Sequence, residues 1–122
     1  MIIDTHAHYD DKVFDEDRDI LLAGMQQAGI GRIVNIGSSM DACRRTLDMI
    51  NQYDFMYGAL GVHPCDSEQL TEDDMEWLKQ QSAHEKCVAI GEIGLDYYWD
   101  EPERDIQRKW FVCQLELARE VK

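Results

Sequence analysis

The chain has 122 residues, and 12 basic against 25 acidic side chains give it a formal charge of −13 at pH 7. Hydrophobic residues make up 44% and charged residues 30%, which excludes a disordered chain and is typical of a globular domain. The acidic balance argues against a protein that binds nucleic acid through clustered Lys and Arg. The length excludes a closed (β/α)₈ barrel, which needs about 250 residues, so we expect a single domain over residues 1–122.

Targeting signals and disulfides are not indicated by the sequence. No apolar run approaches the about 18 residues of a membrane-spanning helix, and the first residues lack the pattern of a signal peptide. The four cysteines are far apart and form no CxxC motif, which favours reduced thiols; they are Cys43, Cys65, Cys87 and Cys113. We therefore expect a cytoplasmic protein with no membrane partner.

The first half of the chain alternates strand and helix patterns. Residues 1–4 predict a strand that runs directly into Thr5-His6-Ala7-His8. Residues 15–28 predict a helix that ends at Gly29. Its expected apolar face consists of Ile20, Leu21, Gly24, Met25 and Ala28. Residues 32–37 predict a second strand, followed by a helix after Ser38-Ser39 with Met40, Cys43, Leu47 and Ile50 on one face.

The second half continues the alternation. Residues 55–60 predict a third strand, and Thr71 with Asp74 resembles a capping box that starts a third helix. Residues 87–90 predict a fourth strand. A last helix from about residue 103 has an apolar stripe of Ile106, Trp110, Cys113, Leu117 and Val121. The βαβαβαβα order predicts an α/β fold with parallel strands joined by right-handed crossovers.

His6 and His8 are the first candidate metal ligands. They lie two residues apart at the end of the first strand, so both side chains face the same side and one ion could take both imidazoles. The alternative is a pair of ordinary histidines, which an isolated HxH favours. Their position shifts the balance, because functional side chains of parallel α/β folds gather at the carboxyl ends of strands.

Glu92 occupies the equivalent end of the fourth strand, between Gly91 and Gly94. Its carboxylate could bridge two cations about 3.5–4 Å apart, and the glycines leave room for close approach. A solvated glutamate at a strand end is an equally weighted alternative.

His63 ends the third strand before Pro64, where it could contact a substrate phosphate or a metal-bound water, or be an ordinary loop histidine. Asp4 and Asp96 could orient ligand imidazoles or cap local turns. Asp10 and Asp11 are interpreted as caps of the first helix. Three of four strands thus end in a His or Glu, and this convergence favours a metal site.

Three segments together resemble the TatD family of metal-dependent deoxyribonucleases: Ile2-Ile3-Asp4-Thr5-His6-Ala7-His8-Tyr9-Asp10, Gly61-Val62-His63-Pro64 and Gly91-Glu92-Ile93-Gly94-Leu95-Asp96-Tyr97. The last block is the most specific, whereas HxH is shared with amidohydrolase-like proteins more widely. Tyr9 departs from the family, which more often has an aliphatic residue there.

The resemblance implies a parallel (βα)₄ half of a TIM-type (β/α)₈ barrel, with two divalent ions (Mg, Mn or Zn) at the carboxyl rim. It implies that His6 and His8 bind one ion, that Glu92 bridges both and is catalytic, and that His63 acts near the phosphate. Asp96 would support the site. Activated water would then cleave a DNA phosphodiester bond.

The resemblance also implies that the site is incomplete, because family ligands on later strands have no counterpart here. We therefore expect poor metal binding and little or no activity from the 122-residue chain alone. The open edges of such a half-barrel predict self-association or a missing C-terminal half that covers them. Two alternatives are an amidohydrolase or esterase acting on a cyclic amide, a lactone or aminoacyl-tRNA, and an inactive half-barrel module.

Overall fold

Four parallel strands form one sheet in the order β1-β2-β3-β4 in the computed structural model, which describes all 122 residues. The strands are β1 (Ile2–Ala7), β2 (Ile30–Ile36), β3 (Met56–Leu60) and β4 (Cys87–Ile90). The α-helices are α1 (Arg18–Ala23), α2 (Met40–Gln52), α3 (Glu72–Gln81) and α4 (Arg104–Val121). Short 3₁₀ helices follow β1 and β3, namely η1 (Lys12–Phe14) and η2 (Pro64–Gln69).

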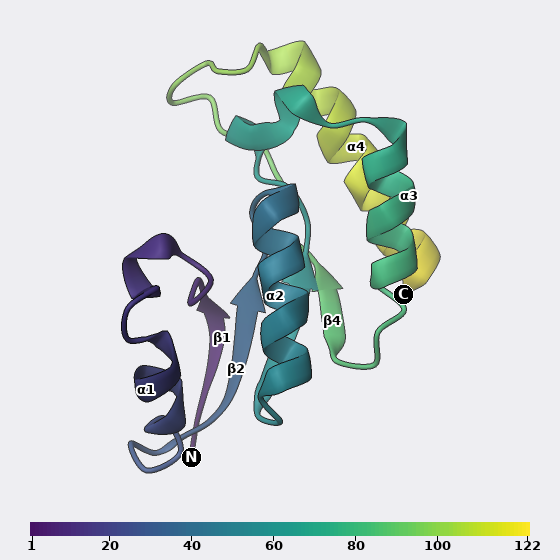
Figure 1. Cartoon of the computed structure of the whole chain (residues 1–122). Coiled ribbons are helices and arrows are strands. Elements are labelled where there is room, and N and C mark those ends of the chain that lie inside the picture. The colour runs from purple at the N-terminus through teal and green to yellow at the C-terminus, as the bar shows by residue number, and fades with distance from the viewer.

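This order confirms the predicted α/β architecture of four βα units, which corresponds to half of a TIM-type barrel. Figure 1 shows the four strands ending on the same side, with α1 beside β1, α2 over the middle of the sheet, and α3 and α4 beyond β4. The carboxyl ends of all four strands therefore form one rim. Sequence-distant loops meet there, as the chain order required.

The two inner strands are buried and the two outer strands are not. β2 and β3 each have two neighbours in the sheet: three of seven β2 residues and four of five β3 residues are buried, and of the rest only Arg32 is exposed. β1 and β4 each have one neighbour and expose apolar side chains, including Ile2, Ile3 and Val88. The sheet thus has two open edges.

The core lies between the inner strands and the helices. Ile33, Met56 and Leu60 of the inner strands are fully enclosed, and they pack in one cluster with Leu22, Ile50 and Leu78 from the helices. Cys43, Leu47 and Ile50 are buried on α2, which confirms the predicted face of that helix. Trp110 and Leu117 are buried on α4, and the rest of its predicted stripe packs against the same cluster.

The predicted helix starts are confirmed in detail. The Ser39 hydroxyl accepts a hydrogen bond from the Ala42 N–H and caps α2. Thr71 and Asp74 form a reciprocal capping box at α3, where each side chain accepts from the backbone N–H of the other. These starts are local, so short-range sequence patterns suffice to predict them.

The prediction for the first helix was wrong in length and only partly right in facing, since Met25 is buried and Leu21 packs against the core as expected. α1 spans only Arg18–Ala23, and turns occupy residues 15–17 and 24–28. Ile20 is 78% exposed, whereas Leu22 is fully buried. One cause is Arg18, whose guanidinium donates to the carbonyls of Tyr9 and Asp11 and so ties the helix start to the loop after β1. Gly29 ends the turn with φ +90°, a conformation that favours glycine.

None of the helices combines the length and the apolarity needed to cross a bilayer. All four cysteines are free.

Candidate metal centre

His6, His8 and Glu92 converge at the carboxyl rim of the sheet. His6 lies in β1, His8 follows it directly, and Glu92 follows β4. The Nε2 atoms of the two imidazoles are 3.1 Å apart. The Glu92 Oε2 lies 3.9 Å from the Nε2 of His6 and 3.6 Å from the Nε2 of His8. Residues at the two outer strands are thereby joined in one cluster.

The ring of His8 is oriented for ligation. Its Nδ1 lies 2.9 Å from the carbonyl oxygen of Ile36, an acceptor only, so Nδ1 carries the proton and donates. Nε2 then keeps its lone pair and faces the other two donors. A second hydrogen bond that fixes the tautomer of a histidine in this way is typical of metal ligands.

Glu92 is held by the ends of the two inner strands. Its backbone N–H donates to the Gly37 carbonyl at 2.7 Å, and the Gly91 N–H donates to the Leu60 carbonyl at 2.9 Å. Gly61 passes so close to Gly91 that a Cβ on Gly61 would lie 2.7–2.9 Å from the Gly91 backbone. A glycine at position 61 is therefore required for Glu92 to reach the rim in this position.

His63 presents a hydrogen-bond donor to the same rim. Its Nδ1 accepts from the Cys65 N–H at 3.1 Å and caps η2, so the proton of the neutral ring lies on Nε2. Its own backbone N–H donates to the Ser38 carbonyl at 2.9 Å. The Nε2–H is thus available to an anionic oxygen, and the lone pair is already used. This arrangement suits contact with a phosphate better than metal ligation.

Cys65 and Asp96 lie next to His63, and ligand atoms of the three residues are within 4.8 Å of one another. The Cys65 Sγ is 3.8 Å from the Asp96 Oδ2. Partial desolvation, followed by the charges of Asp96 and Asp66, raises the pKa of the Cys65 thiol. The thiol is therefore a donor to Asp96, and the group is linked by its own hydrogen bonds. Asp96 does not contact the imidazoles of His6 or His8, and its Oδ1 accepts from the Tyr98 N–H.

A cavity of about 350 Å³ opens beside the cluster and has no apolar side chain in its wall. It is lined by His8, Asp10, Asp11, Ser38, His63, Asp66 and Glu92. Four of these residues are acids and none is Lys or Arg. The cavity therefore favours cations, and an anionic substrate would bind there only with cations present.

Other predicted residues have local structural roles. The Asp4 carboxylate accepts from the backbone N–H of His6 at 3.1 Å and not from its ring. Asp11 does not cap the predicted first helix: it caps η1 by accepting from the Val13 N–H, and the N-cap residue of α1 is Asp17, whose side chain makes no capping hydrogen bond. Asp10 is not a helix cap: it is buried, and its carboxylate accepts from the side chain of Asn35.

Three buried amide side chains that the sequence analysis missed hold the rim loops. Gln114 is 1% exposed and pairs with both the N–H and the carbonyl of Val62, directly before His63. Gln107 is fully buried and accepts from the Asp96 N–H. Asn35 bonds the segment after His8. Their only sequence signal is a polar residue within an apolar helix or strand.

The donor set of the His6–His8–Glu92 cluster fits a divalent cation. Three ligand atoms at about 2.1 Å from one ion lie about 3.0–3.4 Å apart in octahedral or tetrahedral geometry. The shortest separation here is 3.1 Å and the longest 3.9 Å, half an ångström beyond that range. All three side chains are only partly buried, so small rotations close the difference. Imidazole with carboxylate suits Zn or Mn, and further donors are needed to complete the coordination.

Comparison with known proteins gives a consistent result. The family described as TatD related DNase matches residues 3–122. An uncharacterized metal-dependent hydrolase, YabD of Bacillus subtilis, is 45% identical over 99% of this chain and 48% of its own length. The 3′-5′ ssDNA/RNA exonuclease TatD of Escherichia coli is 31% identical over 88% of this chain and 42% of its own.

Solved structures show the same coverage. The crystal structure of YjjV, a TatD homologue from Escherichia coli, superposes with a TM-score of 0.88 at 35% identity, covering 98% of this chain and 47% of that one. A TatD family hydrolase from Entamoeba histolytica superposes with a TM-score of 0.81 at 23% identity, which supports the fold alone. The chain therefore spans about half the length of the curated relatives that it matches.

Proposed function

Because the chain belongs to the TatD related DNase family, we propose that it contributes half of a metal-dependent hydrolase site that cleaves phosphodiester bonds in DNA. The observation that carries the proposal is the convergence of His6, His8 and Glu92 within 3.9 Å beside an acidic cavity. The names of the exonuclease relatives support nucleic acid as the substrate.

The residues would divide the binding of two divalent ions, taken from Mg, Mn or Zn. His6 and His8 would hold one ion, and Glu92 would contribute its carboxylate to both. Bound divalent ions activate water at neutral pH and neutralise charge on a phosphate during its displacement. The Ile36 carbonyl keeps the His8 Nε2 lone pair facing His6 and Glu92, and the Gly37 carbonyl keeps Glu92 at the rim.

His63 would contribute the protein's own donor to the phosphate. Its Nε2–H is free while its Nδ1 is occupied by the Cys65 N–H. A neutral imidazole that donates to a phosphate oxygen stabilises the charge that develops there. The net charge of −13 otherwise repels the nucleic-acid backbone, so the cations and His63 would together provide the attraction.

Three ligands do not complete a site for two ions, and we propose that the remaining donors come from a further βα half. That half would also cover the open edges of β1 and β4, where Ile2, Ile3 and Val88 are exposed. It could be joined to this chain or be a second copy. A cooperative monomer with no exposed apolar surface, measured by sedimentation and dye binding, would contradict this part of the proposal.

The decisive experiment joins residues 1–122 to the remaining half of the 45% identical Bacillus subtilis relative. We expect chelator-sensitive cleavage of single-stranded DNA by the chimera with Mg²⁺ or Mn²⁺, and negligible cleavage by the 122-residue chain alone. Glu92→Gln in the chimera should abolish cleavage. Glu85→Gln is the matched control, because Glu85 is an exposed glutamate that does not line the cavity.

Two outcomes would overturn the proposal. One is cleavage by the chimera that Glu92→Gln leaves unchanged. The other is a folded, metal-loaded chimera that hydrolyses an amide or lactone but neither DNA nor RNA, which would indicate the amidohydrolase reaction. Equal cleavage of RNA and DNA would broaden the substrate without changing the site.

A further inference from the structure

Asn35 is a fully buried polar residue on the inner strand β2, where its neighbours Ile33 and Ile36 are apolar. Its Cα pairs with that of Ala7, the residue between His6 and His8. A carboxamide at this place costs desolvation free energy that a leucine of similar size would not. The cost is offset only if the amide makes its hydrogen bonds, so these bonds indicate what the residue does.

Every polar atom of the Asn35 side chain is used. Its Oδ1 accepts from the Tyr9 N–H at 2.7 Å, directly after His8. Its Nδ2 donates to the Asp10 Oδ1 at 2.9 Å and to the Thr46 Oγ1 at 2.8 Å. One side chain thus connects the loop after the HxH motif to β2 and to α2. The next residue of the strand is Ile36, whose carbonyl orients the His8 ring.

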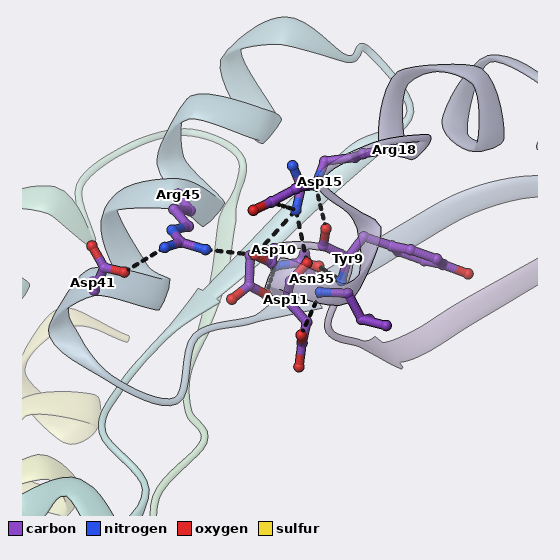
Figure 2. Close-up of polar contacts among 9 residues, drawn as sticks. Tyr9, Asp10, Asp11, Asp15, Arg18, Asn35, Asp41 and Arg45 are labelled. Atoms are coloured by element: carbon purple, nitrogen blue, oxygen red, sulfur yellow. Dashed lines mark hydrogen bonds and ion pairs between the residues drawn. The ribbon is translucent and has the colours of Figure 1, made fainter.

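Two arginines hold the same loop from the other side, through its carbonyl groups. Arg18 donates from Nε to the Tyr9 carbonyl and from its terminal nitrogen to the Asp11 carbonyl. Arg45 donates to the Asp10 carbonyl at 3.0 Å and pairs with Asp41 at 2.9 Å. Figure 2 shows Arg45 on one side and Arg18 on the other side of the Tyr9–Asp11 segment, with Asn35 close to its residues.

We propose that Asn35 is a positioning residue of the metal centre, which fixes the His8–Asp10 backbone so that the His8 Nε2 faces His6 and Glu92. The proposal rests on the metal site proposed above. Asn35 acts through geometry, because it is uncharged and reaches the site only through Tyr9 and Asp10. Its removal leaves the Tyr9 N–H and the buried Asp10 carboxylate without their partner, and the loop must move to recover one.

The test is Co²⁺ binding by the chimera of residues 1–122 with the remaining half of the Bacillus subtilis relative, measured through the visible absorption of the bound ion. We expect Asn35→Leu to weaken Co²⁺ affinity by about 10–100-fold, as is usual when the support of a metal ligand is removed. Thr46→Val removes one of the two acceptors of Asn35 and should weaken affinity by about threefold. Thr46→Ser keeps that acceptor and should retain the affinity of the unmodified chain.

A destabilised control variant distinguishes the proposed positioning role of Asn35 from a role in fold stability alone. Leu78→Ala truncates a fully buried side chain on α3 that takes no part in the rim, so it should lower stability and leave Co²⁺ affinity unchanged. If Leu78→Ala weakens binding as much as Asn35→Leu at equal loss of stability, the positioning role is overturned. If Asn35→Leu does not fold, Thr46→Val against Thr46→Ser decides the question.

A second measurement keeps the two proposals separable. Ring ¹⁵N chemical shifts of His8 in the metal-free chain report which nitrogen carries the proton. We expect the Nδ1–H form in the unmodified chain and a tautomer mixture in Asn35→Leu and Thr46→Val. If the chimera binds no Co²⁺, the proposed metal site fails, and an unchanged His8 tautomer in both variants would overturn the role of Asn35 independently.

Discussion

The outer strands β1 and β4 differ from the inner strands β2 and β3 in both burial and chemistry. The three candidate metal ligands lie in or directly after the outer strands, which are exposed along their open edges. The inner strands are buried and supply the groups that hold those ligands, namely Asn35 and the carbonyls of Ile36, Gly37 and Leu60. Metal affinity and fold stability should therefore respond to changes in different strands.

The largest effect expected from this difference is on stability. Leu60→Ala removes a fully buried side chain from β3 and should lower the free energy of unfolding by about 2–5 kcal/mol. Val88→Ala on β4, where the side chain is 54% exposed, should change it by less than about 0.5 kcal/mol. Urea unfolding of both variants measures the difference. Equal losses would mean that the open edge is covered in solution.

Metal binding should depend on residues of the outer strands, whereas stability depends on residues of the inner strands. With a divalent ion at 100 times its dissociation constant, the chain should gain about 2.7 kcal/mol of stability, which a chelator removes. His8→Ala should lose this gain while its metal-free stability stays near that of the unmodified chain, because His8 is a partly exposed rim residue. Thermal melting of the unmodified chain and of His8→Ala, each with and without Zn²⁺ or Co²⁺, measures the gain. A full gain in His8→Ala would place the ion elsewhere.

Gly61→Ala tests the contact between an inner strand and an outer one. The added Cβ would lie 2.7–2.9 Å from the Gly91 backbone, so we expect a loss of about 1–3 kcal/mol and weaker metal binding through the displaced Glu92. Gly24→Ala is the control, because its Cβ would meet nothing closer than 3.6 Å. Unfolding and Co²⁺ titration are compared. Unchanged metal affinity in Gly61→Ala would separate Glu92 from this contact.

The smallest effect concerns pH and Cys43, a buried residue of α2 whose thiol donates to the Gly61 carbonyl after the inner strand β3. Burial raises the pKa of the Cys43 thiol from 9.0 to about 12. The unfolded chain therefore loses this proton above pH 9 while the folded chain keeps it, so stability falls as the pH rises from 9 towards 12. Relative to Cys43→Ala, the unmodified chain should lose about 1.4 kcal/mol by pH 10. If the free energies of unfolding of the two chains change in parallel between pH 7 and 10, this prediction is wrong.

The sequence alone predicted the order of the strands and helices, the caps of α2 and α3, and the meeting of His6, His8, His63 and Glu92 at one rim. These features depend on short-range patterns and on one rule, that parallel strands end on the same side. Hydrophobic period, cap residues and strand ends are all readable within a few consecutive positions. The physical information that fixes them is local.

Only the tertiary structure decided how those residues are held. Asp10 and Asp11 have the same predicted role as helix caps, yet Asp11 caps η1 and Asp10 is buried against Asn35, which is 25 residues away. Gln114 reaches Val62 across 52 residues. The first helix is shorter than its sequence pattern predicts, because Arg18 donates hydrogen bonds to backbone carbonyls outside the helix. A buried polar group is stable only where distant segments supply its partners, and no local pattern encodes which segments will meet.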